Sequence, residues 1–460
     1  MKDLTQGPIA RQLVVLAVPI AAGMVFQTLY FLVDLYFVAQ LGGAAIAGVS
    51  TAGTFTFVTL ALTQVLGVGT VALVSQAAGR KDRNEANLIF NQSVLLSAIC
   101  GLLTLVGGYA LTGPYLRAVA ADPATVAAGA TYLHWYIPGL ALQFALVAMG
   151  SALRGTGIVQ PTMVVQLLTV VLNTVLAPML IAGWGTNHPL GVAGAGLAST
   201  VAVACGVAFL WIYFVKLENY VALEPGAWRP RPRALRRILN IGLPAGGEFL
   251  MMFVILVVIY WAIRSFGAAA QAGSGIAFRV MQAFFLPVMA LAFAASPVAG
   301  QNFGAGKAAR VKETFRAAAV LSSLLMLALT LLCQWRPQVL IQAFSRDPDV
   351  IAVGAVFLQV ISWNFVANGV IFTCSSLFQA MGNTWPALLS SGLRLATFVL
   401  PAAWLSRQPD FELQHLWYLS VCSVTLQAAT SLLLLRGEFR RKLGPLLAPA
   451  SGLGAAPSSR

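Results

Sequence analysis

Residues 76–79 read Gln-Ala-Ala-Gly and residues 301–304 read Gln-Asn-Phe-Gly, so that Gln76 and Gly79 recur 225 positions later as Gln301 and Gly304. Apolar composition alone would not keep such motifs in phase over so long a stretch. The sequence therefore predicts an internal duplication. The same offset relates further pairs: Pro19 and Pro244, Gly42 and Gly267, Gly48 and Gly273, Asp122-Pro123 and Asp347-Pro348, Gly157 and Gly382, and Pro161 and Pro386.

Each copy holds six apolar segments that are long enough to cross about 30 Å of hydrocarbon. Six crossings return the chain to its starting side, so the two copies have the same orientation and a pseudo-two-fold axis along the membrane normal. We predict an all-α membrane protein with twelve transmembrane helices in two like-oriented six-helix lobes. The twelve segments lie near 12–34, 51–75, 92–114, 128–151, 161–182, 191–215, 238–263, 275–300, 317–334, 350–373, 386–405 and 414–436.

The composition excludes several classes of protein. The chain is 59% hydrophobic and only 9% charged, whereas a soluble protein is about 25% charged. Five cysteines and three histidines lie scattered, without the spacing of a disulfide framework or a metal site. There is neither a phosphate-binding GxxxxGK[ST] motif nor a basic-aromatic nucleic-acid module. We therefore expect no enzymatic activity, no cofactor, no metal and no nucleic-acid partner.

The basic residues predict the orientation of the chain. With the N-terminus inside, 21 of the 28 Lys and Arg residues fall on the cytoplasmic side and 5 on the opposite side. We expect a multi-pass protein of the plasma (inner) membrane that contacts membrane lipid and has both termini in the cytoplasm. The predicted parts are an N-terminal lobe at 1–215, a cytoplasmic linker at 216–236, a C-terminal lobe at 237–440 and a disordered cytoplasmic tail at 441–460.

Four charged residues lie inside predicted spans, where insertion of such a side chain costs roughly 2.5–3.5 kcal/mol. None is duplicated, because their counterparts at the 225-residue offset are uncharged, so the repeat fold does not require them. Each is therefore a candidate functional residue. The four are Asp34, Glu248, Arg279 and Arg394.

Asp34 has no basic residue within its own span. Its protonation would depend on which side of the membrane the surrounding lobe faces, which is the property that a proton-coupled carrier needs. The alternative is a structural hydrogen bond to a neighbouring helix. Pro19, about four turns earlier, removes one helix hydrogen bond and is a candidate hinge, although a fixed kink would look the same.

Glu248, Arg279 and Arg394 form a candidate substrate or second-lobe polar site. A pairing of Glu248 with either arginine would lower the cost of insertion. Such a pair is either a structural ion pair or a counter-charge for a substrate or proton, and the sequence leaves both readings open.

The chain resembles the multidrug and toxic compound extrusion (MATE) family over about residues 10–440. Each stretch that supports the resemblance is weak evidence alone, but together the stretches occur in the same order as in the family. The stretches are LVDLYFVAQLGGAAIAGVS (32–50), VALVSQAAGRKD (71–82), ALRGTGIVQPTMVVQLLTVVLN (152–173), IGLPAGGEF (241–249), AFRV (277–280), SPVAGQNFGAGK (296–307), DPDVIAVG (347–354) and FQAMGNTWPALL (378–389).

The resemblance implies a V-shaped pair of bundles that exports small, drug-like amphipathic compounds, often cations, in exchange for H⁺ or Na⁺. It implies that Asp34 is the ion-coupling residue of the first lobe and that Asn173 and Ser199 belong to the same site. At the position where the family pattern NxxxDP has an aspartate, this chain has Ala177. Because a hard cation prefers several anionic oxygen ligands, we expect H⁺ rather than Na⁺ as the coupling ion.

A flippase for a lipid-linked or polysaccharide precursor, from the same superfamily, is the alternative function. Aromatic side chains that a drug-like cation would need are available in several spans, where packing between helices or an interfacial belt is the alternative role. The chain is expected to act as a monomer. The aromatic candidates are Phe26, Tyr30, Phe31, Tyr36, Tyr260, Trp261, Phe284 and Phe285.

Overall fold

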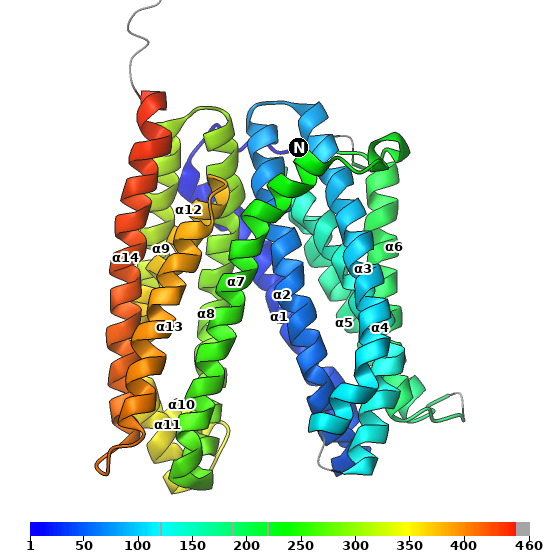
Figure 1. Cartoon of the computed structure of the whole chain (residues 1–460), viewed down its shortest axis with the longest axis vertical. Helices are drawn as coiled ribbons and strands as arrows, with labels where there is room; N and C mark the ends of the chain where they lie inside the picture. The colour runs from blue at the N-terminus through cyan, green and yellow to red at the C-terminus, as the bar shows by residue number, and fades with distance from the viewer. Residues whose placement is uncertain (120–121, 186, 219, 448–460) are drawn as a thin grey trace, which may run out of the picture.

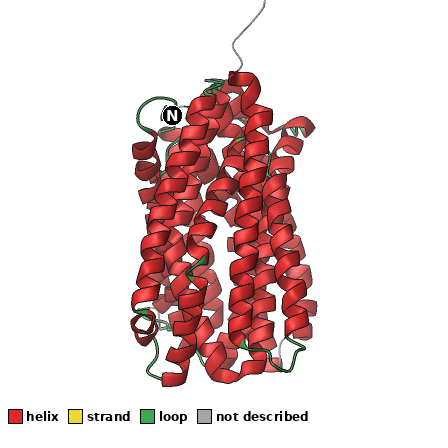
Figure 2. Ribbon diagram, turned by 90° about the vertical axis from the view of Figure 1, so that its left-hand side faces the viewer, coloured by secondary structure: helices red, strands yellow, loops and turns green. Residues whose placement is uncertain are grey.

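The computed structural model of the chain describes residues 1–119, 122–185, 187–218 and 220–447. All regular secondary structure within these ranges is helical, as Figure 2 shows. The helices are α1 (Ile9–Ala39), α2 (Gly43–Gly79), α3 (Arg83–Val119), α4 (Pro123–Gly155), α5 (Gln160–Ile181), α6 (Val192–Lys216), α7 (Pro232–Ile263), α8 (Gly267–Gly304), α9 (Ala308–Trp335), α10 (Pro337–Gln342), α11 (Pro348–Ile361), α12 (Asn364–Ala380), α13 (Trp385–Leu405) and α14 (Leu413–Leu447), with two 3-10 helices, η1 (Pro225–Trp228) and η2 (Arg264–Phe266).

The helices account for the twelve predicted crossings. Ten helical runs in the described part of the chain are long and apolar enough to span a membrane, and the bent pair of α11 and α12 makes an eleventh. One of the ten, Pro232–Gly304, has 73 residues, far more than one crossing needs. This run consists of α7 and α8, which η2 joins. Counted separately, α7 and α8 give twelve passes, and the predicted two-lobe all-α fold is confirmed.

The duplicated Asp-Pro motifs begin equivalent helices in the two lobes. Asp122 accepts a hydrogen bond from the Thr125 backbone N–H (2.9 Å) at the start of α4. Asp347 accepts one from the Asp349 backbone N–H (2.9 Å) at the start of α11. The proline that follows each aspartate occupies the first helical turn, where its missing N–H costs nothing. The repeated Asp-Pro motif therefore begins an equivalent helix in each lobe.

The duplicated Gly-x3-Pro motifs form equivalent turns before α5 and α13. Gly157 and Gly382 adopt φ values of +79° and +72°. This left-handed conformation is strained for any residue with a Cβ, so the turn requires glycine. Pro161 and Pro386 then lie in the first turn of the next helix.

The second lobe departs from the first at one crossing. Its fourth span is bent by 54° between α11 and α12, whereas the equivalent α4 is one unbroken helix. The Thr330 hydroxyl donates to the Ser362 carbonyl (2.9 Å), and Gln334 Nε2 donates to the Ser362 hydroxyl (2.9 Å), which satisfies polar groups freed by the break. The structure therefore differs from the single span expected at 350–373.

The two lobes lie close together at one end of the molecule and apart at the other, as Figure 1 shows. We call the end that carries the N-terminus and residues 216–231 the seam end, and the opposite end the open end. Helix α1 packs against α8 of the other lobe and α5 of its own, and α7 likewise packs against α2 and α13. The two-fold relation of the lobes therefore extends to the contacts between them.

The lobes touch backbone to backbone at the seam. A Cβ placed on Gly79 would lie 2.0 Å from the Gln301 carbonyl oxygen, and one on Gly304 would lie 2.1 Å from the Gln76 carbonyl oxygen. No real Cβ approaches this closely, so the seam is complete only with glycine at both positions.

The N-terminal segment crosses the same seam. The Lys2 backbone N–H donates to the Thr156 carbonyl (2.8 Å) of the first lobe. The Leu4 backbone N–H donates to Gln301 Oε1 (2.9 Å) of the second lobe, and Asn302 Nδ2 donates to the Leu4 carbonyl (3.1 Å). The Leu4 side chain is fully buried. This segment therefore fastens one lobe to the other.

The connection between the lobes is ordered by α3. Asn91 Nδ2 donates to the Ala222 carbonyl (2.8 Å), and Gln92 Nε2 donates to the carbonyls of Ala227 (2.8 Å) and Arg229 (2.9 Å). Within the stretch expected as linker, η1 forms and α7 already begins at Pro232. Of the expected tail, residues 441–447 continue α14, and residues 448–460 lie outside the described residues.

Candidate functional site

Asp34 lies on α1 with only 8% of its surface exposed. Its Oδ1 atom is buried and has no hydrogen-bond partner in the described part of the chain. A carboxyl oxygen in that position is costly unless a proton or a cation accompanies it. The setting is therefore suited to reversible binding of a positive ion rather than to permanent structural bonding.

The two other residues expected in the first-lobe site lie beside Asp34. Asn173 on α5 is fully buried and Ser199 on α6 is 1% exposed. Asn173 Nδ2 donates to the Ser199 hydroxyl at 3.5 Å, and Ser199 is within hydrogen-bonding reach of Asp34. Asn173 Oδ1, like Asp34 Oδ1, has no partner among the described residues. Three helices therefore bring together Asp34 and the two residues that the family resemblance adds to its site.

Tyrosines complete the wall of this site, and the sequence analysis did not assign them to it. Tyr30, one turn before Asp34 on α1, is within reach of Ser199, and its hydroxyl has no partner within the described ranges. Tyr132 and Tyr136 on α4 are 5% and 7% exposed and lie near the Asp34 carboxyl. Their i, i+4 spacing, which puts both rings on one helix face, was the available signal.

The site offers few anionic oxygen atoms. Asp34 supplies the one carboxylate, while Asn173, Ser199 and Tyr30 supply neutral oxygens. Ala177, one turn after Asn173 on α5, is fully buried and adds none.

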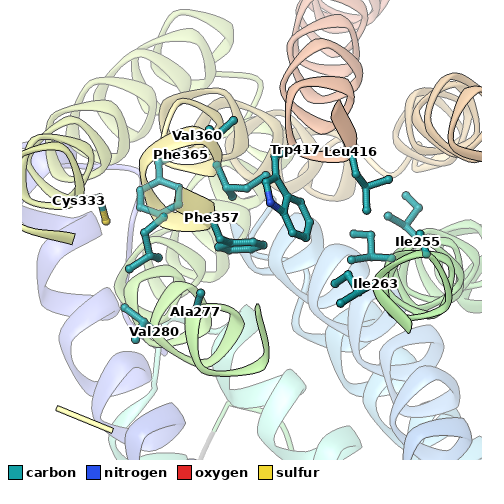
Figure 3. Packing of buried hydrophobic residues seen from close by; sticks show 14 of the residues in the cluster. Ile255, Ile263, Ala277, Val280, Cys333, Phe357, Val360, Phe365, Leu416 and Trp417 are labelled. Carbon is teal, nitrogen blue, oxygen red and sulfur yellow. The ribbon is translucent and has the colours of Figure 1, made fainter. Parts of the chain in front are cut away.

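The second lobe contains no copy of this site. Ile259 stands at the position equivalent to Asp34, and Ile255 at that of Tyr30. Phe357 and Phe398 are the counterparts of Tyr132 and Asn173. All four belong to the hydrophobic core of the second lobe, where Figure 3 shows Ile255 and Phe357 among the packed side chains. At these equivalent positions the first lobe therefore has polar side chains and the second lobe has apolar ones.

Glu248 is tied to α12 rather than to an arginine. The Ser375 hydroxyl donates to Glu248 Oε2 at 2.9 Å. The ion pairs in the described part of the chain involve Glu85 and Glu438, and none involves Glu248. The pairing with Arg279 or Arg394 considered above is therefore absent within these ranges. Ser375 also lines a cavity of about 50 Å³ together with Met289, Ala292, Phe293, Phe372, Ser376 and Gln379.

The two in-span arginines have separate surroundings. Arg394 on α13 is half-buried and donates from Nη1 to Gln427 Oε1 at 3.5 Å. Arg279 on α8 is exposed. The three residues expected as one second-lobe polar site are thus each placed differently: Glu248 against α12, Arg394 against α14, and Arg279 on the surface of α8.

Pro19 lies within α1 at the point where the helix passes from one lobe to the other. Before it, Leu13, Leu16 and Ala17 pack in a cluster with α8. After it, Gly23 lies against Gln166 of α5, 3.6 Å from an added Cβ. A missing backbone hydrogen bond at this boundary would let the two halves of α1 move separately.

One further charged residue, just beyond the predicted span 128–151, lies at the seam. Arg154, in the last turn of α4, is half-buried, donates from Nη2 to the Ser151 hydroxyl (2.9 Å) and stacks over Phe293 of α8 (5.7 Å to the ring centroid). It is therefore part of the contact between the lobes.

Comparison with known proteins reproduces the duplication. The family model described as MatE matches residues 19–179 and again residues 244–405. The two matches begin 225 residues apart, which is the offset of the repeat, and each covers the first five crossings of one lobe.

Characterised relatives match over most of their length. The chain is 27% identical over 417 residues to a probable multidrug resistance protein, YpnP, of Bacillus subtilis, covering 90% of each chain. It is 22% identical over 395 residues to the multidrug export protein MepA of Staphylococcus aureus, covering 86% of each. A solved multidrug resistance MATE family transporter in an outward-facing conformation superposes with a TM-score of 0.89 at 23% identity, covering 97% of this chain and 99% of the other.

Proposed function

The chain belongs to the MatE family of multidrug efflux transporters, and from that premise we propose that it exports amphipathic organic compounds in exchange for protons that enter through the first lobe. The observation that carries this proposal is Asp34. It is a buried carboxyl whose Oδ1 has no hydrogen-bond partner among the described residues, and the equivalent position of the second lobe is held by Ile259.

The proposed proton path begins at the open end. Asp34 takes up a proton while the lobes are apart at that end, and Ser199, which Asn173 holds by a hydrogen bond, orients the carboxyl. Release on the other side requires the seam to open. Since a neutral carboxyl and a carboxylate differ in the cost of burial, the two protonation states favour different packing of α1.

The distribution of basic residues gives the orientation in this proposal. The seam end carries the linker arginines and the N-terminal segment, so it faces the cytoplasm by the positive-inside rule. The open end then faces the exterior, and the structure corresponds to an outward-open state. Return to the inward-open state bends α1 at Pro19 and breaks the contacts of Gly79 and Gly304.

Sodium is the second choice of coupling ion. A Na⁺ site in the first lobe would be built from Asp34, Asn173 and Ser199, with Ala177 contributing no oxygen. A single carboxylate and neutral oxygens give a weak cation site, because hard cations bind best to several oxygen ligands that include anionic ones. Protonation of Asp34 needs no such set.

Glu248 has a structural role in this proposal. Its bond from Ser375 joins α7 to α12, and no arginine within the described ranges neutralises it. The residue is half-buried, and Ser375, which donates to it, lines a small cavity.

The test is efflux from everted membrane vesicles, with pH and Na⁺ gradients imposed one at a time. We expect the pH gradient alone to drive export by the native chain. Asp34→Asn, which keeps the size of the side chain, should lose at least about tenfold in rate. Asp410→Asn, at an exposed position near the open end, is the matched control and should export normally. Full activity in Asp34→Asn at equal expression would overturn the proposal.

One observation favours the alternative function, flipping of a lipid-linked or polysaccharide precursor. The family resemblance favours cations as cargo, whereas the one exposed charged side chain deep within the described spans is Arg279. An arginine suits the phosphate groups of such precursors better than an organic cation.

A further inference from the structure

The exposed sides of α1 and α7 match each other residue by residue. On each helix an exposed arginine near the seam end is followed, at steps of seven residues, by apolar side chains that are between 45% and 62% exposed. Seven residues make almost two turns, so these side chains lie on one side of the helix. The equivalent pairs are Arg11 and Arg236, Val18 and Leu243, Val25 and Leu250, and Leu32 and Val257. The duplication therefore extends to the outer surface of the fold.

At the seam end this side of each helix faces lipid. The opposite side of α1 is buried through Leu13 and Leu16, and the opposite side of α7 through Ile238 and Ile241. Since the lobes are in contact at the seam end, exposed apolar side chains there have only the lipid tails as surroundings. We call the two series of exposed side chains the lipid stripes of α1 and α7.

The length of the lipid stripes places both arginines at the level of lipid headgroups. Towards the open end each stripe reaches an aromatic residue, Tyr36 or Trp261, which are 64% and 50% exposed. Each aromatic residue follows its arginine by 25 residues, or about 37 Å of helix. That length exceeds the roughly 30 Å of hydrocarbon and fits within the roughly 40–45 Å that includes the headgroups. With the aromatic ring at one interface, the guanidinium group lies among the headgroups of the other leaflet.

Cations of both lobes gather at the start of α1. The first turns of α1 pack in a cluster with α8 and α9 of the second lobe. Arg310 of α9 donates from Nη2 to the carbonyl of Gly7 (2.9 Å), which is about one turn before Arg11. Lys307 donates from Nζ to the Thr5 carbonyl (2.8 Å). A headgroup at Arg11 would therefore lie among positive charges from both lobes.

The start of α7 has the equivalent arrangement. Figure 1 shows α7 crossing from the first lobe at the seam end to the second lobe, and its first turns pack in a cluster with α2 and α3. Arg237 Nη1 lies 2.7 Å from Glu85 Oε1 of α3, and Arg80 Nη2 lies 2.5 Å from Glu85 Oε2. Arg236 is the next residue to this cluster, and Arg233, one turn earlier, is exposed. Here too positive charges of both lobes meet.

Neither stripe arginine has a counter-ion in the part of the chain that the structure describes. Arg11 and Arg236 belong to none of the ion pairs found there. The acidic groups of the same two segments are engaged, because Asp3 accepts hydrogen bonds from Thr5 and Glu85 is shared by two arginines. Along the sequence, the seam end carries 21 basic residues against 7 acidic ones, an excess equal to the net charge of +14 of the whole chain. This charge is left to be balanced from outside the chain.

We propose that two anionic phospholipids bind at these equivalent sites, one with its phosphate group on Arg11 and the other on Arg236, with their acyl chains along the lipid stripes. A guanidinium group donates two parallel hydrogen bonds to a phosphate. Because each headgroup lies among cations of both lobes, the bound lipids reduce the repulsion across the seam and favour its closed state. This inference is independent of the cargo and of the coupling ion proposed above.

Native mass spectrometry of the full-length chain released from lipid nanodiscs tests the binding. The nanodiscs contain phosphatidylglycerol and phosphatidylcholine in equal amounts and with the same acyl chains. We expect the native chain to retain two phosphatidylglycerol molecules, with a preference of about fivefold at each site. Arg11→Gln with Arg236→Gln should lose the preference at both sites, and either single variant at one.

Two control variants separate these sites from folding and from overall charge. Arg11→Lys with Arg236→Lys keeps both charges and should keep the preference. Lys81→Gln with Arg231→Gln removes two charges from exposed positions at the same end, away from the lipid stripes, and should retain lipid as the native chain does. A native chain without preference for phosphatidylglycerol, or an equal loss in this control and in the Arg11 and Arg236 variant, would overturn the proposal.

The effect on the seam is measured by double electron–electron resonance between labels at Ala44 and Ala268, at the open ends of α2 and α8. We expect a longer distance in nanodiscs that contain phosphatidylglycerol than in phosphatidylcholine alone, and no such difference in Arg11→Gln with Arg236→Gln. A native distance that does not change with lipid would contradict the effect on the seam. Asp34→Asn should retain lipid normally, so a failure of the proposed proton coupling is distinguishable from a failure of this inference.

Discussion

Gln76 and Gln301 hold the two lobes together by reciprocal hydrogen bonds. Gln76 Nε2 donates to the Ala380 carbonyl at 2.8 Å, and Gln301 Nε2 donates to the Gly155 carbonyl at 3.1 Å. The acceptors, like the donors, are 225 residues apart, so the pseudo-two-fold axis relates one bond to the other. The repeated glutamine is thus a contact between the copies rather than a feature within each.

Replacing both glutamines should favour opening of the seam. Each buried hydrogen bond contributes about 0.5–1.5 kcal/mol, so Gln76→Met with Gln301→Met should weaken the closed seam by roughly twice that amount. We expect a shorter distance between the open ends of α2 and α8. Double electron–electron resonance between labels at Ala44 and Ala268, in a background without the five native cysteines, measures it. An unchanged distance distribution would contradict this role.

A side chain at Gly79 should prevent the seam from closing. The Gln301 carbonyl oxygen lies 2.0 Å from an added Cβ, and forced overpacking costs about 1–3 kcal/mol. We expect Gly79→Ala to reduce export by about tenfold and to populate the seam-open state in the same resonance measurement. The control is Gly107→Ala on α3, where nothing lies within 4 Å of the added atom. Equal export by both variants would show that the seam can accommodate an added methyl group.

Adding a carboxylate to the first-lobe site should change its ion preference. Ala177 lies one turn from Asn173 on the same face of α5. Ala177→Asp would supply a second anionic oxygen ligand, and hard cations gain most from such a ligand. We expect a Na⁺ gradient to drive export by this variant and not by the native chain. Ala177→Asn, similar in size and uncharged, should show no gain; a gain there would point to a steric effect.

The N-terminal segment should contribute measurably to the closed seam. Leu4 is fully buried, and its replacement by alanine should cost roughly 2–5 kcal/mol. Hydrogen exchange of residues 2–7 should then accelerate. Val14→Ala, which truncates a 46% exposed side chain on α1, should have little effect.

The same segment should be insensitive to pH in the physiological range. The backbone N–H and the hydroxyl of Thr5, both 2.8 Å from Asp3 Oδ1, hold the pKa of Asp3 below its ordinary value. A lowered pKa contributes stability above the ordinary value of about 3.9, which is lost only as the pH falls through the lowered pKa. Exchange protection of residues 2–7, corrected for intrinsic rates, should therefore stay constant from pH 8 to pH 5.

The repeat made much of the fold predictable, because it gave both the number of crossings and their relation. The break between α11 and α12 could not be predicted. The residue equivalent to Trp363 is Pro138, so the helix-breaking residue lies in the lobe whose helix stays continuous. The bend instead depends on hydrogen bonds from Thr330 and Gln334 of α9. Such tertiary contacts leave no local pattern.

The charged residue of the candidate site could be predicted from the sequence. Asp34 stood out because its apolar span makes a carboxylate expensive. Tyr132 and Tyr136 did not, since tyrosines at helical spacing are common in membrane helices. The depth of Arg279 in its span was readable, but its exposure on the surface of α8 was not, because exposure depends on how the helices pack.

The apolar core around Ile259 has an electrical consequence. In the proposed mechanism Asp34 is the coupling carboxyl and Ile259 stands at its counterpart, so each cycle carries one proton inward. A monovalent cation leaving in exchange would make the cycle electroneutral, whereas a monovalent anion leaving would make the cycle move two positive charges inward. The membrane potential would then supply about 2.3 kcal/mol per charge for every 100 mV, and turnover would generate an inward current.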